Sequence, residues 1–252
     1  KSDPHPWKTL DSRIHYAMLD SGGVAPNVVQ ARAVVRYAIR APELPAMFDL
    51  IRRVTKVAEG AALMTETQME SRVVSAVSNL LANEPLEAAM GRVFDRLGPV
   101  QFDAADREYA ARIQKTLSPD HVPSSYASIG MEPTDAPLCD FVVPREGVGK
   151  PMGSTDVGDV SWVVPTVQAR VATFAIGTPL HTWQVTAQGK SPAAHKGFVH
   201  AAKVMASTAI EALLDPTIIT AAKADLKKRA GAGYVSPLPA NVQPPLKFTS
   251  SN

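Results

Sequence analysis

The chain is poor in cysteine and lacks the long apolar runs that span membranes. Cys139 is the single cysteine in 252 residues, which excludes an internal disulfide framework and any multi-cysteine metal site and fits a reducing compartment. No uninterrupted apolar run approaches the roughly 20 residues that cross a bilayer, and residues 1–6 lack the basic-then-apolar order of a secretory signal. We therefore expect a cytoplasmic protein without a membrane partner.

The chain also lacks a strong charge of either sign. Its 26 basic and 24 acidic residues give a formal net charge of +2, and they are scattered without long blocks. Such a surface offers no electrostatic footprint for nucleic acid, so we expect no nucleic-acid partner. Apolar residues make up 45% of the chain, which is ample for the core of one large domain or two small ones.

The first third of the chain has the pattern of a small α+β domain. Apolar residues alternate over 13–19 and 33–40, which predicts two antiparallel strands, and they recur every three or four residues over 44–62, which predicts an amphipathic helix. A weaker alternation over 68–76 predicts a third strand. This β-β-α-β order is part of a ferredoxin-like domain, to which we assign residues 1–82.

The rest of the chain, residues 83–252, alternates helical and β-branched segments and predicts an α/β domain. Helical spacing marks four segments: 84–98, 104–117, 197–214 and 218–228. Charge-free, β-branched runs over 160–164 and 171–176 predict two buried strands. The proline-rich stretch 118–152 predicts a long surface loop. The predicted fold class is therefore α/β with two domains.

One decapeptide, Gly153–Trp162, gathers the clearest chemical signals. It holds Asp156 and Asp159 among small residues before a β-branched run, which predicts a tight acidic loop leading into a strand. His181 follows in a Leu-His-Thr-Trp-Gln frame, and carboxylates with a histidine suit a hydrolytic metal site. A phosphate-binding loop is the weaker interpretation, because the glycine spacing is wrong, no lysine follows and the aspartates would repel phosphate.

Several motifs together resemble a known family. They are Gly153–Ser161, Gly177–Gln184 and Ala194–Gly197, with Ala25–Val29 and Gly60–Leu63 upstream. In this order they resemble the zinc-dependent aminoacylase and carboxypeptidase family of metallopeptidases and amidohydrolases. The resemblance covers nearly the whole chain.

The resemblance implies a two-domain enzyme. Its α/β catalytic domain would bind two divalent metal ions, zinc first with manganese or cobalt as alternatives, and its ferredoxin-like lid would form the dimer contact. A metal-activated water would hydrolyse an amide bond in an N-acyl or aminobenzoyl amino acid or in a dipeptide. The partner would be a second copy or a paralogous subunit.

The family's early metal ligands and its catalytic glutamate have no counterpart from Lys1 onward. We therefore expect the chain to be the later part of a longer protein, with the C-terminal part of the catalytic domain, and we assign it no catalytic residue. The alternative function is a non-catalytic dimerisation or binding subunit that retains the lid and half of the site.

The resemblance assigns His181 as a metal ligand; the structural alternative is a loop histidine bonded to backbone. His195 is the rival ligand or a substrate-binding residue, and the alternative is a helix-entry residue. The resemblance implies that Asp156 and Asp159 orient ligands through hydrogen bonds, and ordinary turn chemistry is their alternative.

Two residues of the predicted lid complete the set of candidates. The resemblance implies that Asn27 binds substrate in the partner's site, through an amide that can both donate and accept. It also implies that Arg40 binds the substrate carboxylate, for which a guanidinium is suited because it can bind bidentately. The alternative for Arg40 is a solvated residue at a strand end.

Overall fold

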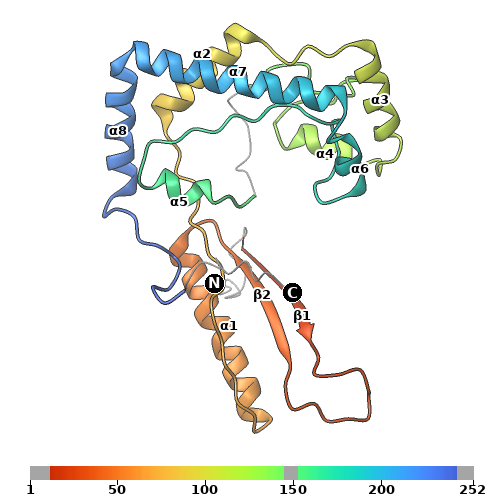
Figure 1. Ribbon diagram of the computed structural model, residues 1–252, viewed down its shortest axis with the longest axis vertical. Helices are drawn as coiled ribbons and strands as arrows, with labels where there is room; N and C mark the ends of the chain where they lie inside the picture. The colour runs from red at the N-terminus through yellow and green to blue at the C-terminus, as the bar shows by residue number, and fades with distance from the viewer. Residues whose placement is uncertain (1–11, 145–152, 243–252) are drawn as a thin grey trace, which may run out of the picture. The chain divides into compact units, whose positions relative to one another are not determined.

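The computed structural model describes residues 12–144 and 153–242, and they form two compact units (Figure 1). Of the described residues, the first unit holds 12–80, 154–159 and 235–242. The second unit holds 81–144, 153 and 160–234. Part of the predicted proline-rich loop and the end of the chain lie outside the described residues.

The first unit is built on a two-stranded antiparallel sheet and one long helix. Strand β1 (Arg13–Asp20) pairs with β2 (Val34–Arg40), and α1 (Leu44–Met64) contacts β2 (Figure 1). These elements confirm the two predicted strands, their antiparallel pairing and the predicted helix. The sheet is thinly covered, because every residue of β1 is exposed.

The third strand predicted over 68–76 is wrong. The segment forms no strand pairing, and within the described residues β1 and β2 make up the whole of the sheet. Alternation shows which face of a segment could be buried, but a strand forms only where a neighbouring strand supplies N–H and C=O partners. The β-β-α-β order of a partial ferredoxin-like lid is therefore not complete in the described residues.

The second unit is helical. Its helices are α2 (Glu84–Leu97), α3 (Ala104–Gln114), α4 (His121–Ala127), α6 (Trp183–Gln188), α7 (Pro192–Leu214) and α8 (Pro216–Ala230). Four of them confirm the helices predicted over 84–98, 104–117, 197–214 and 218–228, and α4 falls within the stretch predicted as a loop. The mixed content of the chain confirms the coarse α/β class.

Side-chain caps fix where these helices begin. Asn83 accepts from the N–H of Leu86 at the start of α2, and Ser191 accepts from Ala194 at the start of α7. Asp103 and Asp106 form a capping box at the start of α3. Such caps satisfy N–H groups that have no partner inside the helix.

The helices of the second unit enclose three small apolar cores, two of them where α2 packs against α7 and α8 (Figure 1). One core joins Met90 and Val93 of α2 to Val204 of α7. A second joins Leu86 and Ala89 to α8, and the third lies around Phe102, Ile113 and Leu138.

Both buried strands predicted in this unit are wrong. Residues 157–161 form the short helix α5 (Val157–Ser161), and 171–176 form no strand pairing. Val160, Val163 and Val164 are about half exposed rather than buried. Fully apolar β-branched runs predict strands because they suit the interior of a parallel sheet, and the described residues contain no such sheet to receive them.

Within the described residues, one helix is long and apolar enough, by length and composition alone, to cross a membrane. This helix is α7, with 23 residues and a mean hydropathy that reaches 1.2. Lysines and histidines interrupt α7 without lowering its average hydropathy much, so the helix passes this test although the uninterrupted apolar runs within it are short. Core helices pass the same test, and α7 packs on α2.

Candidate functional site

His181 lies in a short loop whose backbone is unusual. The loop connects a buried turn at 175–178 to helix α6, and His181 itself is exposed with φ of 63°. A side chain in this left-handed region costs roughly 1–2 kcal/mol, so the surrounding contacts must hold it there. At the far end of the loop, the hydroxyl of Thr182 donates to the carbonyl of Pro179 at 2.8 Å.

A buried glutamine, Gln188, fixes the near end of this loop. Its Oε1 accepts from the N–H of Ala175 at 2.7 Å, and its Nε2 donates to Thr178 Oγ1 and to the carbonyl of Gln184, both at 3.1 Å. The Thr178 hydroxyl in turn donates to the Ala175 carbonyl at 2.7 Å. The sequence pattern did not reveal Gln188, because nothing in a lone polar residue between Ala187 and Gly189 signals burial.

The decapeptide Gly153–Trp162 contains helix α5 instead of the predicted loop and strand. Asp159 accepts hydrogen bonds from the backbone N–H and the hydroxyl of Ser78, at 3.1 and 2.6 Å. Gly158 lies so close to this segment that an added Cβ would stand 2.1 Å from the Ser78 carbonyl oxygen. These contacts anchor the decapeptide to residue 78, and Asp156 remains exposed beside Thr155.

Asn27 and Arg40 both lie on the exposed hairpin of the first unit. Asn27 is in the turn region between the strands, and Arg40 ends β2 directly opposite Arg13 of β1. Opposite residues of an antiparallel pair project from the same face, and like charges there repel. Among the described residues neither guanidinium forms an ion pair, so the pair offers positive charge to an anion.

The other histidines of the second unit differ in their surroundings. His195 is exposed in the first turn of α7, where its backbone N–H donates to the Ser191 carbonyl. His200 is half-buried with its ring 6.4 Å from that of Phe94, and its Nε2 is buried without a hydrogen-bond partner. Nδ1 of His121 is likewise buried without a partner. His195 is thus available to a ligand, whereas His200 packs within the unit.

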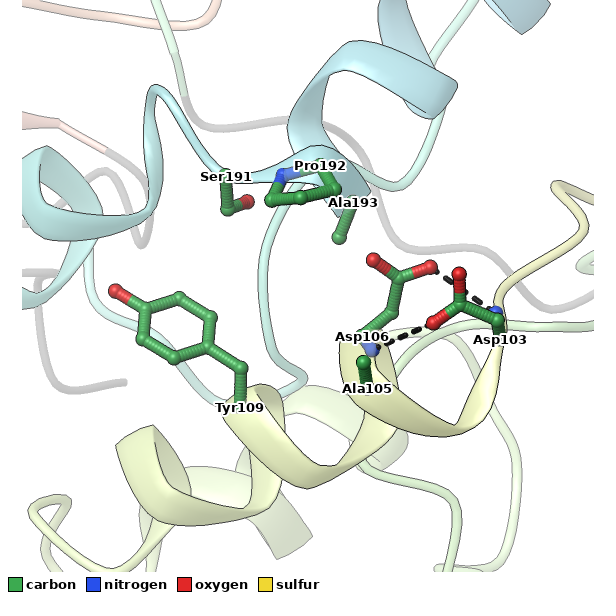
Figure 2. A pocket seen from close by; sticks show the side chains of 7 residues that line it. All are labelled: Asp103, Ala105, Asp106, Tyr109, Ser191, Pro192 and Ala193. Atoms are coloured by element: carbon green, nitrogen blue, oxygen red, sulfur yellow. Dashed lines mark hydrogen bonds between the residues drawn. The ribbon is translucent and has the colours of Figure 1, made fainter.

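A small hollow of about 110 Å³ lies between the beginnings of α3 and α7 (Figure 2). It is lined by Asp103, Ala105, Asp106, Tyr109, Ser191, Pro192 and Ala193. The ammonium of Lys196 pairs with both carboxylates, and its hydrogen bond to Asp103 holds the pKa of that carboxyl below its ordinary value. None of the predicted site residues lines this hollow, and the Lys196 ammonium beside it is already paired with both carboxylates.

The predicted site residues divide between the two units. Asn27, Arg40, Asp156 and Asp159 belong to the first, and His181 and His195 belong to the second. Cys139, outside the predicted site, is partly buried, and this burial raises the pKa of its thiol. A neutral thiol is a poor nucleophile, so Cys139 is not a candidate for catalysis.

No family model matches the chain. Over 94% of its length, however, the chain is 40% identical to a subunit of the p-aminobenzoyl-glutamate hydrolase of Escherichia coli strain K12. The chain is similar to this hydrolase subunit. It is also 25% and 24% identical to the Xaa-Arg dipeptidases of Mus musculus and Homo sapiens, each over 85% of the chain. These relatives confirm the resemblance that the sequence motifs predicted.

The chain spans about half the length of the curated relatives that it matches. It covers 52% of the p-aminobenzoyl-glutamate hydrolase subunit and 40% of each dipeptidase. The described residues also bring together no group of three or more His, Cys, Asp or Glu side chains that could hold a metal ion. A metal ion therefore does not fit the described residues as a complete site, although the His181 imidazole is chemically suited to supply one ligand.

Proposed function

We propose that the chain takes part in hydrolysing an amide bond in a p-aminobenzoyl-glutamate-like compound, another N-acyl amino acid or a dipeptide. The observation that carries this proposal is the 40% identity to the p-aminobenzoyl-glutamate hydrolase subunit over 94% of the chain. The names of the more distant relatives support the same bond type, since a dipeptidase also cleaves an amide. These substrates share an amide close to a carboxylate.

The guanidinium pair on the hairpin supports recognition of that carboxylate. Arg13 and Arg40 stand opposite each other and carry no ion pair within the described part of the chain. A carboxylate placed between them would relieve their repulsion and accept bidentate hydrogen bonds. The Asn27 amide, on the same hairpin, is proposed to bind the substrate's polar groups by donating and accepting hydrogen bonds.

His181 is proposed as the residue of the second unit that acts at the reaction centre. Its imidazole would be one ligand of a divalent metal, with His195 as the rival, and the family resemblance favours two zinc ions with manganese or cobalt as alternatives. Asp156 and Asp159 are proposed to orient neighbouring groups. Because the described residues do not form a complete metal site, we assign no step of the reaction to the metal.

The proposal includes a partner and a place in the cell. The relative is named as one subunit of its hydrolase, which supports either a second copy of the chain or a paralogous subunit as partner. The single cysteine supports the reducing cytoplasm.

A second candidate function is a non-catalytic dimerisation or binding subunit. The observation that favours it is that the described residues gather no three metal ligands. In that case the chain would bind an aminobenzoyl or acyl amino acid through the hairpin without cleaving it.

The intact protein that contains this chain should be purified and incubated with p-aminobenzoyl-glutamate, an N-benzoyl amino acid and a dipeptide ending in arginine. Each incubation should contain zinc, manganese, cobalt or a chelator, and product release should be followed by chromatography. We expect metal-dependent cleavage of at least one substrate. Arg40→Leu should raise KM about 10–100-fold, since a bidentate charged contact is lost, whereas the exposed control Arg32→Leu should change little.

The same assay distinguishes the proposed roles of His181 and His195. His181→Ala should abolish cleavage if His181 acts at the reaction centre, and His195→Ala should do so if the rival assignment is right. Absence of cleavage by the intact protein with every metal, together with calorimetric binding of p-aminobenzoyl-glutamate, would establish the non-catalytic binding role and reject the hydrolase. If the protein shows neither cleavage nor binding, both proposed functions are rejected.

A further inference from the structure

The left-handed backbone of His181 needs support from the contacts around it, of which the Thr182–Pro179 hydrogen bond within the loop is one. The residue is exposed and has φ of 63°, in the left-handed region that side chains rarely adopt. Its neighbour Leu180 is exposed as well, so apolar burial does not hold this part of the loop in place. Hydrogen bonds at the two ends of the loop are the remaining source of order.

Backbone bonds hold the end nearer to 175 to Pro137 and within its own turn, and the side chain of Gln188 joins this end to α6. The amide of Gln188 has two donor hydrogens and an acceptor oxygen, and all of them are engaged, with Thr178, Gln184 and Ala175. The amide thereby ties the turn before the loop to the last turn of α6 after it. His181 lies in the chain between the two segments that Gln188 joins.

A core role alone does not account for a glutamine at this position. Gln188 is 2% exposed, and burying an amide is unfavourable unless its hydrogen bonds are made. Leucine or methionine of similar size would fill the same volume without that penalty. What the amide adds is a fixed distance and orientation between the 175–178 turn and α6.

We propose that Gln188 is a positioning residue, which holds the 178–182 loop so that His181 is presented in one orientation. The inference rests on the proposed function, in which His181 acts at the reaction centre. Gln188 itself touches neither substrate nor reacting atoms. It acts through the loop, whatever the imidazole of His181 binds.

The test compares Gln188→Leu, which keeps the volume and removes all three hydrogen bonds, with Gln188→Glu, which keeps the acceptor. Thr208→Val is the matched control, because it removes a buried hydroxyl bond within α7, from Thr208 Oγ1 to the Val204 carbonyl, away from the loop. Nuclear magnetic resonance on the full chain should record the His181 ring and backbone shifts and the hydrogen exchange of the Ala175 amide.

In Gln188→Leu we expect Ala175 exchange to rise at least about tenfold and the His181 signals to shift and broaden, as the loop samples several conformers. In Gln188→Glu the shift should be partial and should diminish as the pH is lowered, since a protonated carboxyl can donate to Thr178. Thr208→Val should leave the His181 signals unchanged. Unchanged His181 signals in both Gln188 variants, or equal changes in the control, would overturn the proposal.

Kinetics then connect the loop to the reaction. With p-aminobenzoyl-glutamate as substrate, Gln188→Leu should lower kcat about tenfold or more while KM changes less than about twofold, because a misplaced group acts mainly on the chemical step. Wild-type kcat with displaced His181 signals would reject the positioning role in the reaction. If the intact unaltered protein cleaves nothing, the proposed function fails, and the resonance data still decide whether Gln188 orders His181.

Discussion

The two units are stabilised in different ways, although both contain regular elements that the sequence pattern predicts. In the second unit, α2 buries Met90 and Val93 against its neighbours. In the first unit, β1 is exposed at every position, and Tyr16 and Met18 are 73% and 57% exposed. Periodicity thus predicts an element equally well whether or not another surface covers it.

This difference predicts where the chain is sensitive to mutation. Burial removes apolar area from water and is the main source of folding free energy, so an element without burial contributes little. Mutations of the same chemical type should therefore be costly in the second unit and nearly neutral in the hairpin of the first. Matched mutations, one in each unit, test this difference.

The largest difference in the free energy of unfolding is expected when a methionine in each unit is replaced by alanine. Met90→Ala should lower the free energy of unfolding by about 2–5 kcal/mol, because it leaves a cavity in the core shared with Val93 and Val204. Met18→Ala on β1 should change it by no more than about 0.5 kcal/mol. Chemical denaturation followed by circular dichroism measures both. Equal effects would show that the hairpin is covered in solution.

The next difference concerns two glycines within helices. A Cβ at Gly197 of α7 would stand 2.2 Å from the backbone oxygen of Ala172, so Gly197→Ala should destabilise the second unit by about 1–3 kcal/mol. Nothing lies within 4 Å of a Cβ at Gly60 of α1, and Gly60→Ala should stabilise that helix by about 0.5–1 kcal/mol. Hydrogen exchange of peptides from each helix separates the effects. A destabilising Gly60→Ala would contradict the open surroundings of α1.

A smaller difference is expected at two helix starts. Asn83 caps α2 and also donates to the Ala222 carbonyl of α8 at 2.9 Å, so Asn83→Ala should cost about 1–2 kcal/mol. Glu43, before α1, makes no capping bond with its side chain, and Glu43→Ala should change stability by less than about 0.5 kcal/mol. Thermal unfolding measures both. Asn83→Ser, which keeps a capping oxygen but cannot reach as an amide does, should fall between.

Capping residues and helical spacing made most helices predictable from the sequence. Strands were harder to predict, because a strand also needs a second strand to pair with. Asn83 with a following proline predicts the start of α2, and the helix begins there. The runs at 160–164 and 171–176 have strong strand composition, yet a strand exists only when another strand pairs with it. Composition does not show whether such a partner is present, so these two predictions failed.

For the candidate site, the sequence predicted the residues but not what holds them. The motif around His181 identified the histidine, whereas its left-handed backbone and its support by Gln188 follow from packing across 13 residues of chain. Asp159 was predicted to orient a ligand, and in the structure it accepts hydrogen bonds from Ser78, 81 residues away. No local pattern encodes contacts between such distant residues.

The smallest difference between the units is expected in how acid affects the stability that two ionic clusters contribute. In the second unit Lys196 bridges Asp103 and Asp106 of α3, and its hydrogen bond to Asp103 lowers the pKa of that carboxyl below 3.8. In α1, Asp49 pairs with Arg52 and Arg53 within one turn, and the hydrogen bond from Arg52 lowers its pKa likewise. A lowered folded-state pKa gives stability that is present above 3.8 and lost as the pH falls toward the folded value.

Of these two clusters the Lys196 cluster joins two helices and the Asp49 cluster lies within one, so protonation of the first should weaken the packing of its unit more. Asp103→Asn keeps a good cap, because asparagine and aspartate cap equally well, but it removes the titrating charge. The denaturation midpoint of the second unit should therefore depend less on pH between about 5 and 3 in Asp103→Asn than in the unaltered chain. Asp49→Asn should leave that dependence unchanged. Asp103 is exposed whereas Asp106 is buried, so about 1 M salt should reduce the part of the difference that comes from Asp103. A pH dependence in Asp103→Asn equal to that of the unaltered chain would contradict the prediction.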